Sequence, residues 1–346
     1  MIKTYLLFIL SYILTFLLTY FGVERFRNWT LKRDLLDIPN ERSSHTQPTP
    51  RGGGLVIFFV CLGMFATYSL IFELEKVWAY FAGAIIIGLI SWLDDLYEVS
   101  VVWRFLAHSI AASLVIFSFG FWESIYFPFI GEIFVGRFGI LLTLFGIVWL
   151  INAYNFMDGI DGIAGVQAVA AGIGWLFVGI VWNINSIAFY GIIIAVSSLA
   201  FLLHNWQPAK IFMGDVGSAF LGYTFAVMPL LAMPEVAVRN KNYLPLVGVI
   251  TVSVFVFDSI WTFFKRLLRF EKVWKPHREH IYQKLVISGF SHQKVTILYL
   301  LIALIGNGLL IFWINQRQSV GDFPLIVILF QLFCLLIYSL RKKNLT

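Results

Sequence analysis

Long apolar runs recur along the whole chain, and they limit its fold more than any other feature. A helix of about 20 mostly apolar residues crosses the hydrocarbon core of a bilayer. Eleven such segments lie at about 4–22, 53–72, 78–94, 104–121, 139–157, 163–181, 187–204, 216–233, 244–264, 295–314 and 324–340. Only 13% of the 346 residues are charged, against about 25% in soluble proteins. The sequence therefore predicts an all-α polytopic membrane protein with about 11 transmembrane helices.

Nothing in the sequence divides this chain into parts. It has no Pro-rich linker, low-complexity tract or fixed-period repeat, so residues 1–346 are expected to form a single integral membrane domain. The first apolar run lacks a small-x-small cleavage site, and we expect it to remain as the first helix. Cys61 and Cys334 both lie in apolar runs without a spaced motif, which argues against a disulfide framework.

The basic residues predict the orientation in the membrane. With the N-terminus outside, 19 of the 25 Lys and Arg residues fall in cytoplasmic segments, and cytoplasmic loops are the ones enriched in these residues. We therefore expect the N-terminus outside and the C-terminus in the cytoplasm. The outer segment 123–138, "ESIYFPFIGEIFVGRF", alternates in polarity and has Pro and Gly near its middle, which predicts a short β-hairpin covering the outer face.

The aspartates gather on one side of the membrane. Only Asp322 is predicted to lie outside; the other eight lie in or beside the cytoplasmic side, and they are Asp34, Asp37, Asp94, Asp95, Asp158, Asp161, Asp215 and Asp258. Solvated loops have no reason to prefer aspartate on one side. A site that needs short, rigid carboxylates does.

Two of these acids stand in "NAYNFMDGIDGIAG", directly after a predicted span. Asp158 or Asp161 can cap the following helix, since Asp is a favoured N-cap residue. Capping uses only one of them and does not explain Asn152 and Asn155 upstream or a glycine after each acid. Gly159 lets backbone approach a ligand closely. Oxygen ligands from Asp and Asn suit Mg²⁺ or Mn²⁺ rather than zinc.

Two further acidic motifs end or begin predicted spans. Asp94 and Asp95 end the third span, where acids oppose the helix macrodipole unless a cation lies close by; a solvated helix end is the alternative. Asp215 stands in "IFMGDVGS" before the eighth span, where it can be an N-cap or can belong to a phosphate site at a helix N-terminus. Phe212, beside it, can stack on a base or anchor the loop.

The cytoplasmic loops add basic groups. The first, "DIPNERSSHTQPTPRGGG", carries Arg51 and three glycines, which favour close approach to a ligand or a packed helix over a loop without a role. The largest loop contains "KPHREHIYQKL", in which His277, Arg278 and His280 suit a diphosphate. A basic stripe on anionic lipid explains its lysines but not this order.

Three other polar residues lie within or near spans. Asp258 is an intramembrane acid, and such residues are functional candidates by default; pairing with a basic residue for structure is equally open. His108 and His204 are single histidines near helix ends, and we interpret both as structural.

These features together predict phosphoryl chemistry on a lipid. Aspartates for a metal, glycine-flanked backbone and Arg or His donors converge on one membrane face, which suits a metal-bound diphosphate. A lipid phosphate explains the many spans, because its tail stays in the bilayer. The alternative is a transporter or flippase for a lipid-linked sugar, but the outer halves of the spans lack the polar path that it needs.

The motif series resembles a known family. "DIPNERSSHTQPTPRGGG", "LDD", "NAYNFMDGIDGIAG" and "FMGDVGSAFLGY" are similar, in order, to motifs of the polyprenyl-phosphate N-acetylhexosamine-1-phosphate transferases, over about residues 37 to 300. The resemblance implies Mg²⁺-dependent transfer of a sugar-1-phosphate from a UDP-N-acetylhexosamine to undecaprenyl phosphate, with release of UMP. It also implies the cytoplasmic membrane of a bacterium with the active site on the cytoplasmic face, and no nucleic-acid partner; a homodimer is left open.

The resemblance also assigns roles to residues. It implies Asp94 and Asp95 as lipid-phosphate and catalytic residues, with Asp94 as a candidate second metal ligand, and Asp215 as the principal Mg²⁺ ligand. It places in the uridine-diphosphate pocket Asn155, Asp158, Gly159, Asp161 and Phe212.

The largest loop, here called the histidine loop, departs from one branch of this family. The peptidoglycan translocases carry three adjacent histidines, whereas "HREHIYQKL" followed by "GFSH" resembles the branch that begins O-antigen of lipopolysaccharide or related surface polysaccharides. Some members of that branch prefer a 6-deoxy N-acetylhexosamine to N-acetylglucosamine, so the resemblance leaves the sugar open.

Overall fold

The computed structural model describes residues 2–34, 36–39, 47–272 and 277–343. Part of the segment "DIPNERSSHTQPTPRGGG" and part of the loop that contains "KPHREHIYQKL" lie outside these ranges. The long helices are α1 (Ile2–Lys32), α2 (Gly54–Ile71), α3 (Trp78–Tyr97), α4 (Val101–Phe119), α5 (Gly139–Met157), α6 (Ile163–Trp182), α7 (Asn185–Asn205), α8 (Asp215–Ala232), α12 (His292–Val320) and α13 (Phe323–Lys343). Shorter elements are α9 (Leu244–Thr251), α10 (Ser253–Leu267), α11 (Ile281–Ile287), β1 (Leu36–Asp37), β2 (Thr49–Pro50), β3 (Ser124–Phe127), β4 (Gly131–Phe134), η1 (Gly136–Phe138) and η2 (Val238–Tyr243).

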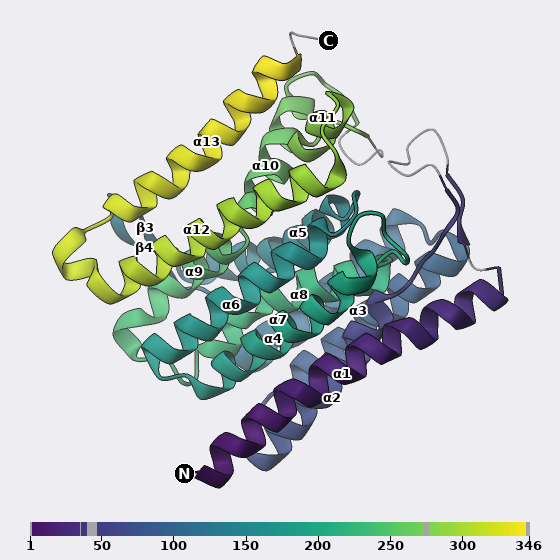
Figure 1. Ribbon diagram of the computed structural model, residues 1–346. Coiled ribbons are helices and arrows are strands. Elements are labelled where there is room, and N and C mark those ends of the chain that lie inside the picture. Colours follow the sequence, from purple (N-terminus) through teal and green to yellow (C-terminus); the bar gives the residue numbers. More distant parts are fainter. Residues whose placement is uncertain (1, 35, 40–46, 273–276, 344–346) are drawn as a thin grey trace.

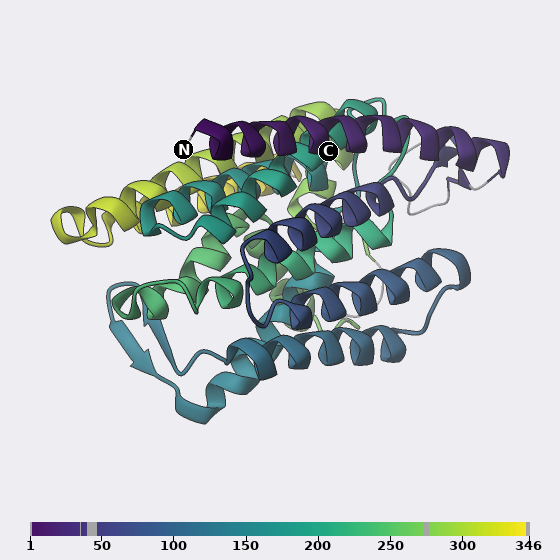
Figure 2. The same cartoon turned by 90° about the horizontal axis from the view of Figure 1, so that it is seen from below.

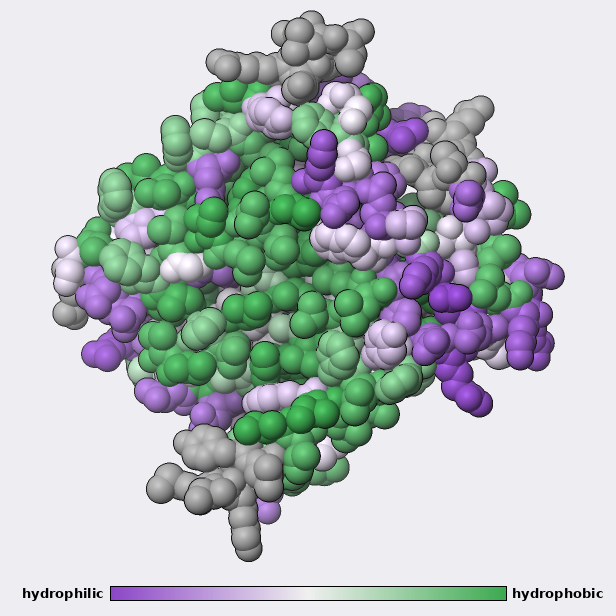
Figure 3. Space-filling view, in the orientation of Figure 1, coloured by the Kyte–Doolittle hydropathy of each residue, from purple (hydrophilic) through white to green (hydrophobic). Residues whose placement is uncertain are grey.

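The predicted class of a helical, multi-pass membrane protein is confirmed. Within the described ranges, 10 helices are long and apolar enough to cross a membrane, or up to 11 if one bent helix pair counts as a span. They lie side by side in a single bundle (Figures 1 and 2). Hydrophobic side chains form a broad area on the face in Figure 3, with hydrophilic residues gathered toward both ends of the bundle.

The two ends of the bundle differ. One end, here called the site end, carries the β1–β2 segment, the loops 158–162 and 206–214, and α11; the opposite end, here called the hairpin end, carries β3, β4 and the α12–α13 turn (Figure 1). The N-terminus of α1 lies toward the hairpin end and the C-terminus of α13 toward the site end. The charge bias of the loops predicts that the site end faces the cytoplasm, and this stays a prediction.

Helix α8 forms the centre of the bundle, with nearly all of its side chains buried. It packs against α5 and α3, and also against α2. Beside it, α6 and α7 approach closely where Gly172 faces Gly191: a Cβ added to Gly172 would lie 2.6 Å from the carbonyl oxygen of Gly191. Glycine at both positions therefore lets these two backbones touch.

One expected span is broken. The straight helix expected over about 244–264 is instead two helices, α9 and α10, within a bent pair whose axes differ by 78°. The break leaves the carbonyl of Thr251 outside the helical pattern, and buried backbone groups without water need another partner. Gln167 Nε2 and Asn307 Nδ2 donate to this carbonyl at 3.2 and 3.3 Å. Hydropathy misses the break because both halves are apolar.

The predicted β-hairpin is confirmed. Strands β3 and β4 pair antiparallel in the register Ser124↔Phe134 to Phe127↔Gly131. Asp322, in the α12–α13 turn, fastens the hairpin by accepting hydrogen bonds from the Tyr126 hydroxyl at 2.6 Å and the Phe129 amide at 2.8 Å. The hairpin therefore covers this end of the bundle, and its position on the outer face stays a prediction.

Close backbone packing also joins α2 to α8. A Cβ added to Gly54 would lie 2.4 Å from the Cα of Gly217, too close for any real contact. The glycines after Arg51 thus allow close helix packing. The sequence predicted either this role or close approach to a ligand.

We predict that Gly54→Ala destabilises the protein by about 1–3 kcal/mol, because the methyl group has to push α2 away from α8. Thermal unfolding of the purified protein measures the effect. Gly63→Ala is the matched control, since it lies in the same helix and its added Cβ would meet nothing within 4 Å. Equal unfolding temperatures for the two variants would contradict this packing.

Candidate active site

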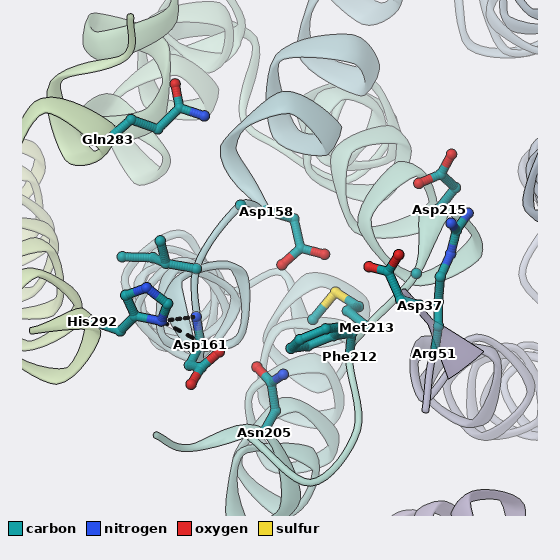
Figure 4. Close-up of a pocket in the computed structure, with 13 residues that line it drawn as sticks. Asp37, Arg51, Asp158, Asp161, Asn205, Phe212, Met213, Asp215, Gln283 and His292 are labelled. Atoms are coloured by element: carbon teal, nitrogen blue, oxygen red, sulfur yellow. Dashed lines mark hydrogen bonds and ion pairs between the residues drawn. The ribbon is translucent and has the colours of Figure 1, made fainter. Parts of the chain in front are cut away.

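A polar pocket of about 240 Å³ opens at the site end of the bundle (Figure 4). It is formed by segments that are far apart in the sequence, from β1 to the start of α12. Its lining consists of Asp37, Arg51, Asp158, Gly159, Ile160, Asp161, Asn205, Phe212, Met213, Gly214, Asp215, Gln283 and His292. Six of these residues were candidates from the sequence, namely Arg51, Asp158, Gly159, Asp161, Phe212 and Asp215.

Backbone hydrogen bonds place Arg51 and Phe212 in the pocket. The Phe212 amide donates to the carbonyl of Pro50 at 2.8 Å, and the amides of Gly52 and Gly53 donate to the carbonyl of Phe212 at 3.1 and 2.9 Å. These bonds hold the end of the first loop against the loop that precedes α8. Pairing of Asp37 with Thr49 across β1 and β2 brings a further carboxylate to the same wall.

The aspartate pair at the end of α3 splits between two partners. Asp95 forms an ion pair with Arg51 and accepts a hydrogen bond from the backbone amide of Asp215 at 3.3 Å. Asp94 instead accepts from Arg104 at 2.6 Å and from the amide of Val99 at 2.7 Å. Asp95 therefore joins the group around Asp215, while Asp94 fastens the turn between α3 and α4. The cation expected beside these acids is an arginine in both cases.

The Asp158–Asp161 segment is not held by helix capping. The N-cap residue of α6 is Gly162 and that of α8 is Gly214, and neither helix has a side-chain cap. The capping explanation considered for Asp158, Asp161 and Asp215 is thus wrong for the observed helix ends. All three carboxylates line the pocket instead.

Contacts from α12 and the loop before α8 orient Asp161. Its carboxylate accepts from the amide of Ala209 at 3.2 Å and lies 3.4 Å from His292 Nδ1. Thr296 donates to its backbone carbonyl at 2.8 Å. In Figure 4, Asp158 points toward the middle of the pocket, whereas Asp161 lies at the side beside His292.

The two asparagines of the motif lie outside the pocket lining. Asn155 donates to the hydroxyl of Ser218 at 3.0 Å in the first turn of α8, next to Asp215. Asn152 donates to the carbonyl of Val148 at 2.7 Å and lies 3.3 Å from His108 Nδ1. Asn155 therefore supports the site from behind, and Asn152 joins α5 to α4.

The histidine loop also lies outside the lining, apart from Gln283. The Nδ1 atom of His280 lies 3.0 Å from a carboxylate oxygen of the buried Asp258. His277 Nδ1 accepts from the amide of Glu279 at 3.3 Å, and burial, with the nearby charges of His280 and Arg266, lowers the pKa of His277 to about 4. Arg278 lies between them, half-buried. The described part of this loop, which connects α10 to α11, thus lies beside the pocket and contacts α10 through His280.

Seven lining residues were not candidates from the sequence, and four of them have polar side chains: Asp37, Asn205, Gln283 and His292. Asp37 stood among the one-sided aspartates, and His292 belongs to the "GFSH" motif, so each left a signal in the sequence. Asn205 bonds the amide of Gly162 at 2.9 Å and the carbonyl of Ile211 at 2.9 Å. A single amide at a helix end gives no sequence signal for this bridging role.

Negative charge is crowded in the pocket. Burial, followed by the nearby Asp215 carboxylate, raises the pKa of Asp158 to about 7, although Arg51 acts in the opposite direction. One arginine therefore does not balance the carboxylates that converge here. A cation or a proton would relieve the repulsion.

The residues present fit a magnesium ion. No group of three or more His, Cys, Asp or Glu side chains in the described ranges forms a complete metal site. Mg²⁺ does not require one, because it binds through one or two carboxylates, several waters and substrate phosphates. Asp215 and the adjacent Asp95 offer oxygen ligands of this kind.

Comparison with known proteins identifies the family. The glycosyl transferase family 4 pattern matches residues 77–233, which include the third to eighth spans and most of the pocket. The chain is 32% identical over 305 residues to a probable undecaprenyl-phosphate N-acetylglucosaminyl 1-phosphate transferase of Bacillus subtilis, covering 87% of this chain and 82% of that protein.

Two further relatives agree. A decaprenyl-phosphate N-acetylglucosaminephosphotransferase of Mycobacterium tuberculosis is 30% identical, covering 84% of this chain and 79% of that protein. An undecaprenyl-phosphate alpha-N-acetylglucosaminyl 1-phosphate transferase of Escherichia coli K12 is 27% identical, covering 79% and 74%. The chain belongs to glycosyl transferase family 4, a family of phosphoglycosyl transferases, and is a multi-pass membrane protein.

The raised pKa of Asp158 predicts a pH-dependent stability. The folded-state pKa of about 7 lies above the value of 3.8 for an exposed aspartate, so the folded protein holds this proton more tightly than the unfolded chain. The associated stability is complete below pH 4 and is lost as the pH rises through 7. Without divalent ions, Asp158→Asn should show a smaller loss of thermal stability than the wild type between pH 5 and 8. Parallel pH profiles would contradict the charge crowding.

Proposed function

We propose that this protein transfers an N-acetylhexosamine-1-phosphate from a UDP-sugar to a polyprenyl phosphate such as undecaprenyl phosphate, with release of UMP. The observation that carries the proposal is the convergence of Arg51, Asp158 and Asp215 in one polar pocket at the end of an apolar bundle. The names of its relatives supply the acceptor class and favour N-acetylglucosamine as the sugar.

The proposed binding site for the isoprenoid chain of the acceptor is an apolar groove. It has a volume of about 360 Å³ and is lined almost wholly by apolar side chains of α5, α8, α9 and α10, with Trp122 and Ile125 at the hairpin end. Helix α10 turns its polar residues inward, among them Asp258 and Thr262, and leaves Phe264 exposed. A single isoprenoid chain fits such a surface, because burying its CH₂ and CH₃ groups is favourable without specific contacts.

Helix α5 connects the groove with the pocket. Phe145 and Trp149 of α5 line the groove, and the same helix ends at Met157, next to Asp158 in the pocket. An acceptor lying along α5 would therefore bring its phosphate toward the carboxylates at the site end. The donor would approach from the aqueous side of the same pocket.

The proposed reaction is one displacement at phosphorus. An oxygen of the acceptor phosphate attacks the β-phosphorus of the UDP-sugar, and a new P–O–P linkage forms. The bond between the β-phosphorus and the bridging oxygen breaks, and that oxygen leaves on UMP. Aligning the two phosphates supplies much of the rate, because it replaces a bimolecular encounter by a reaction within one complex.

The chain's own residues take separate roles in this scheme. Arg51, held by Asp95, supplies positive charge to the diphosphate. Phe212 offers an aromatic face in the pocket wall, and Asp158 and Asp161 offer acceptors for the N–H and O–H groups of a nucleoside. Asp94 and Asp95 are the candidates for accepting a proton from the acceptor phosphate.

Mg²⁺, with Mn²⁺ as a substitute, is the proposed cofactor. It would be held by Asp215, and for the second carboxylate the geometry favours Asp95, which bonds the backbone amide of Asp215, over Asp94, which bonds Arg104 and the amide of Val99 in the turn after α3. When bound, the ion would neutralise charge on the diphosphate and orient the displacement.

We further propose that the site end faces the cytoplasm of a bacterial inner membrane and that the product begins a surface polysaccharide such as O-antigen. Support comes from the Lys and Arg bias of the loops and from the "HREHIYQKL" and "GFSH" motifs. A panel of UDP-N-acetylhexosamines, including 6-deoxy sugars, with product identification by mass, determines the sugar.

Purified protein given a UDP-N-acetylhexosamine, undecaprenyl phosphate and Mg²⁺ should release UMP. We predict that Asp215→Asn lowers kcat by at least about 100-fold, the loss typical of removing one electrostatic stabiliser of a transition state. Asp322→Asn at the hairpin end is the control and should keep wild-type turnover. Full activity of Asp215→Asn would contradict the metal assignment.

The groove makes a separate prediction. Gly146 lines it, and a Cβ added there would meet nothing within 4 Å. Gly146→Leu should therefore fill part of the groove and raise the KM for undecaprenyl phosphate by roughly tenfold, with the KM for the UDP-sugar unchanged. Gly63→Leu is the control, since a Cβ added there also meets nothing within 4 Å but the residue does not line the groove. An unchanged acceptor KM in Gly146→Leu would place the lipid elsewhere.

A further inference from the structure

A buried carboxylate outside the pocket collects an unusual number of hydrogen bonds. Asp258 of α10 has no exposed surface. It accepts from the Thr262 hydroxyl at 3.2 Å, the His280 ring at 3.0 Å, the amides of Ile281 and Tyr282 at 2.8 and 3.2 Å, and the Tyr299 hydroxyl at 2.7 Å. The donors come from α10, from α12 and from the first turn of α11. Asp258 therefore ties three elements together at one point.

Two described basic residues near Asp258 have a different acidic partner. Lys265 and Arg266, on the same helix, pair with Glu279 at 3.0 and 3.3 Å. The basic partner that the sequence left open for Asp258 is His280, supported by two backbone amides at a helix N-terminus. Such amides favour a carboxylate. The arrangement holds α11 by its N-terminal end.

The first turn of α11 in turn touches the pocket. The hydroxyl of Tyr282 donates to the carbonyl of Phe156 at 3.1 Å, and it lies where a Cβ on Gly159 would come within 2.0 Å. Gln283, the next residue, lines the pocket, and its side-chain oxygen accepts from the amide of His280 at 3.2 Å. The position of Tyr282 thus requires glycine at 159. A continuous series of contacts runs from Asp258 through Tyr282 to the Asp158–Asp161 segment.

We propose that Asp258 is a positioning residue for the nucleotide-sugar pocket: it holds the first turn of α11 so that Tyr282 and Gln283 close one side of the Asp158–Asp161 segment. Asp258 itself touches no substrate. The proposal rests on the proposed function for the identity of the donor, but the geometry that it invokes does not.

Helix α10, which carries Asp258, also lines the apolar groove. The groove residues Ile260, Phe263 and Phe264 lie on the side of α10 opposite to Asp258. These residues do not take part in the Asp258 hydrogen bonds. Loss of the carboxylate should therefore disturb the donor side much more than the acceptor side. A general weakening of the fold would disturb both.

The test compares Asp258→Asn with the wild type. Asparagine keeps the size of the side chain but places an NH₂ group opposite amide and hydroxyl donors, so at least one hydrogen bond is lost. We expect the KM for the UDP-sugar to rise by about tenfold or more and the KM for undecaprenyl phosphate to change by less than about twofold. Hydrogen exchange should become faster at Ile281 and Tyr282, and also in the Asp158–Asp161 segment.

Asp322→Asn is the matched control, because Asp322 also accepts several hydrogen bonds but lies at the hairpin end. It should leave the donor KM and the exchange of the site-end segments unchanged. If Asp258→Asn does not fold, Tyr299→Phe, which removes one of the hydrogen bonds from α12, should give a smaller change in the same direction.

An unchanged donor KM, or unchanged exchange of the Asp158–Asp161 segment in Asp258→Asn, would overturn the positioning role. Absence of UMP release by the wild type with every UDP-sugar would instead contradict the proposed function. Hydrogen exchange needs no substrate, so it would still decide whether Asp258 orders the pocket.

Discussion

The lack of water inside the bilayer is the constraint on which the rest of this structure depends. Backbone groups without a helical partner cannot be left in hydrocarbon, so irregular segments are confined to the ends of the bundle or buried in protein. The break between α9 and α10 is of the second kind: Gln167 and Asn307 supply donors to the carbonyl of Thr251. Because the loops are held to the ends, segments as distant in sequence as β1 and the start of α12 meet in one pocket.

The pocket concentrates negative charge in a partly dehydrated place. Burial and the neighbouring Asp215 both raise the pKa of Asp158, and one arginine offsets only part of the repulsion. An arrangement of this kind is costly for a resting protein and useful for one that binds a cation together with a diphosphate. The groove along α5 and α10 complements this pocket, because its almost wholly apolar surface suits an isoprenoid chain. Helix α5 lines the groove and ends beside the pocket, so in the proposed function the polar and apolar substrates would meet near its end.

Much of the fold and part of the site were predictable from the sequence. Hydropathy gives the spans and alternation gives the hairpin. The one-sided aspartates point to the site end, because few other reasons exist for placing acids there. The break after Thr251 was not predictable, since both halves of the segment are apolar. Helix geometry does predict that Asp94 and Asp95 have different partners, because adjacent residues in a helix point about 100° apart. Which acid takes which partner was not predictable, because only the packed neighbours, Arg104 and Arg51, distinguish them.

The sequence by itself determined the class of protein, the number of apolar segments and the chemical kinds of group available, since these follow from composition and periodicity. Tertiary structure decided which of those groups meet. It brought Asp37, Asn205, Gln283 and His292 into the pocket and placed His280 on Asp258 instead. The physical reason is that hydropathy acts on each segment separately. Ion pairs and hydrogen bonds depend on distances of a few ångström between segments, which only the packing of the helices establishes.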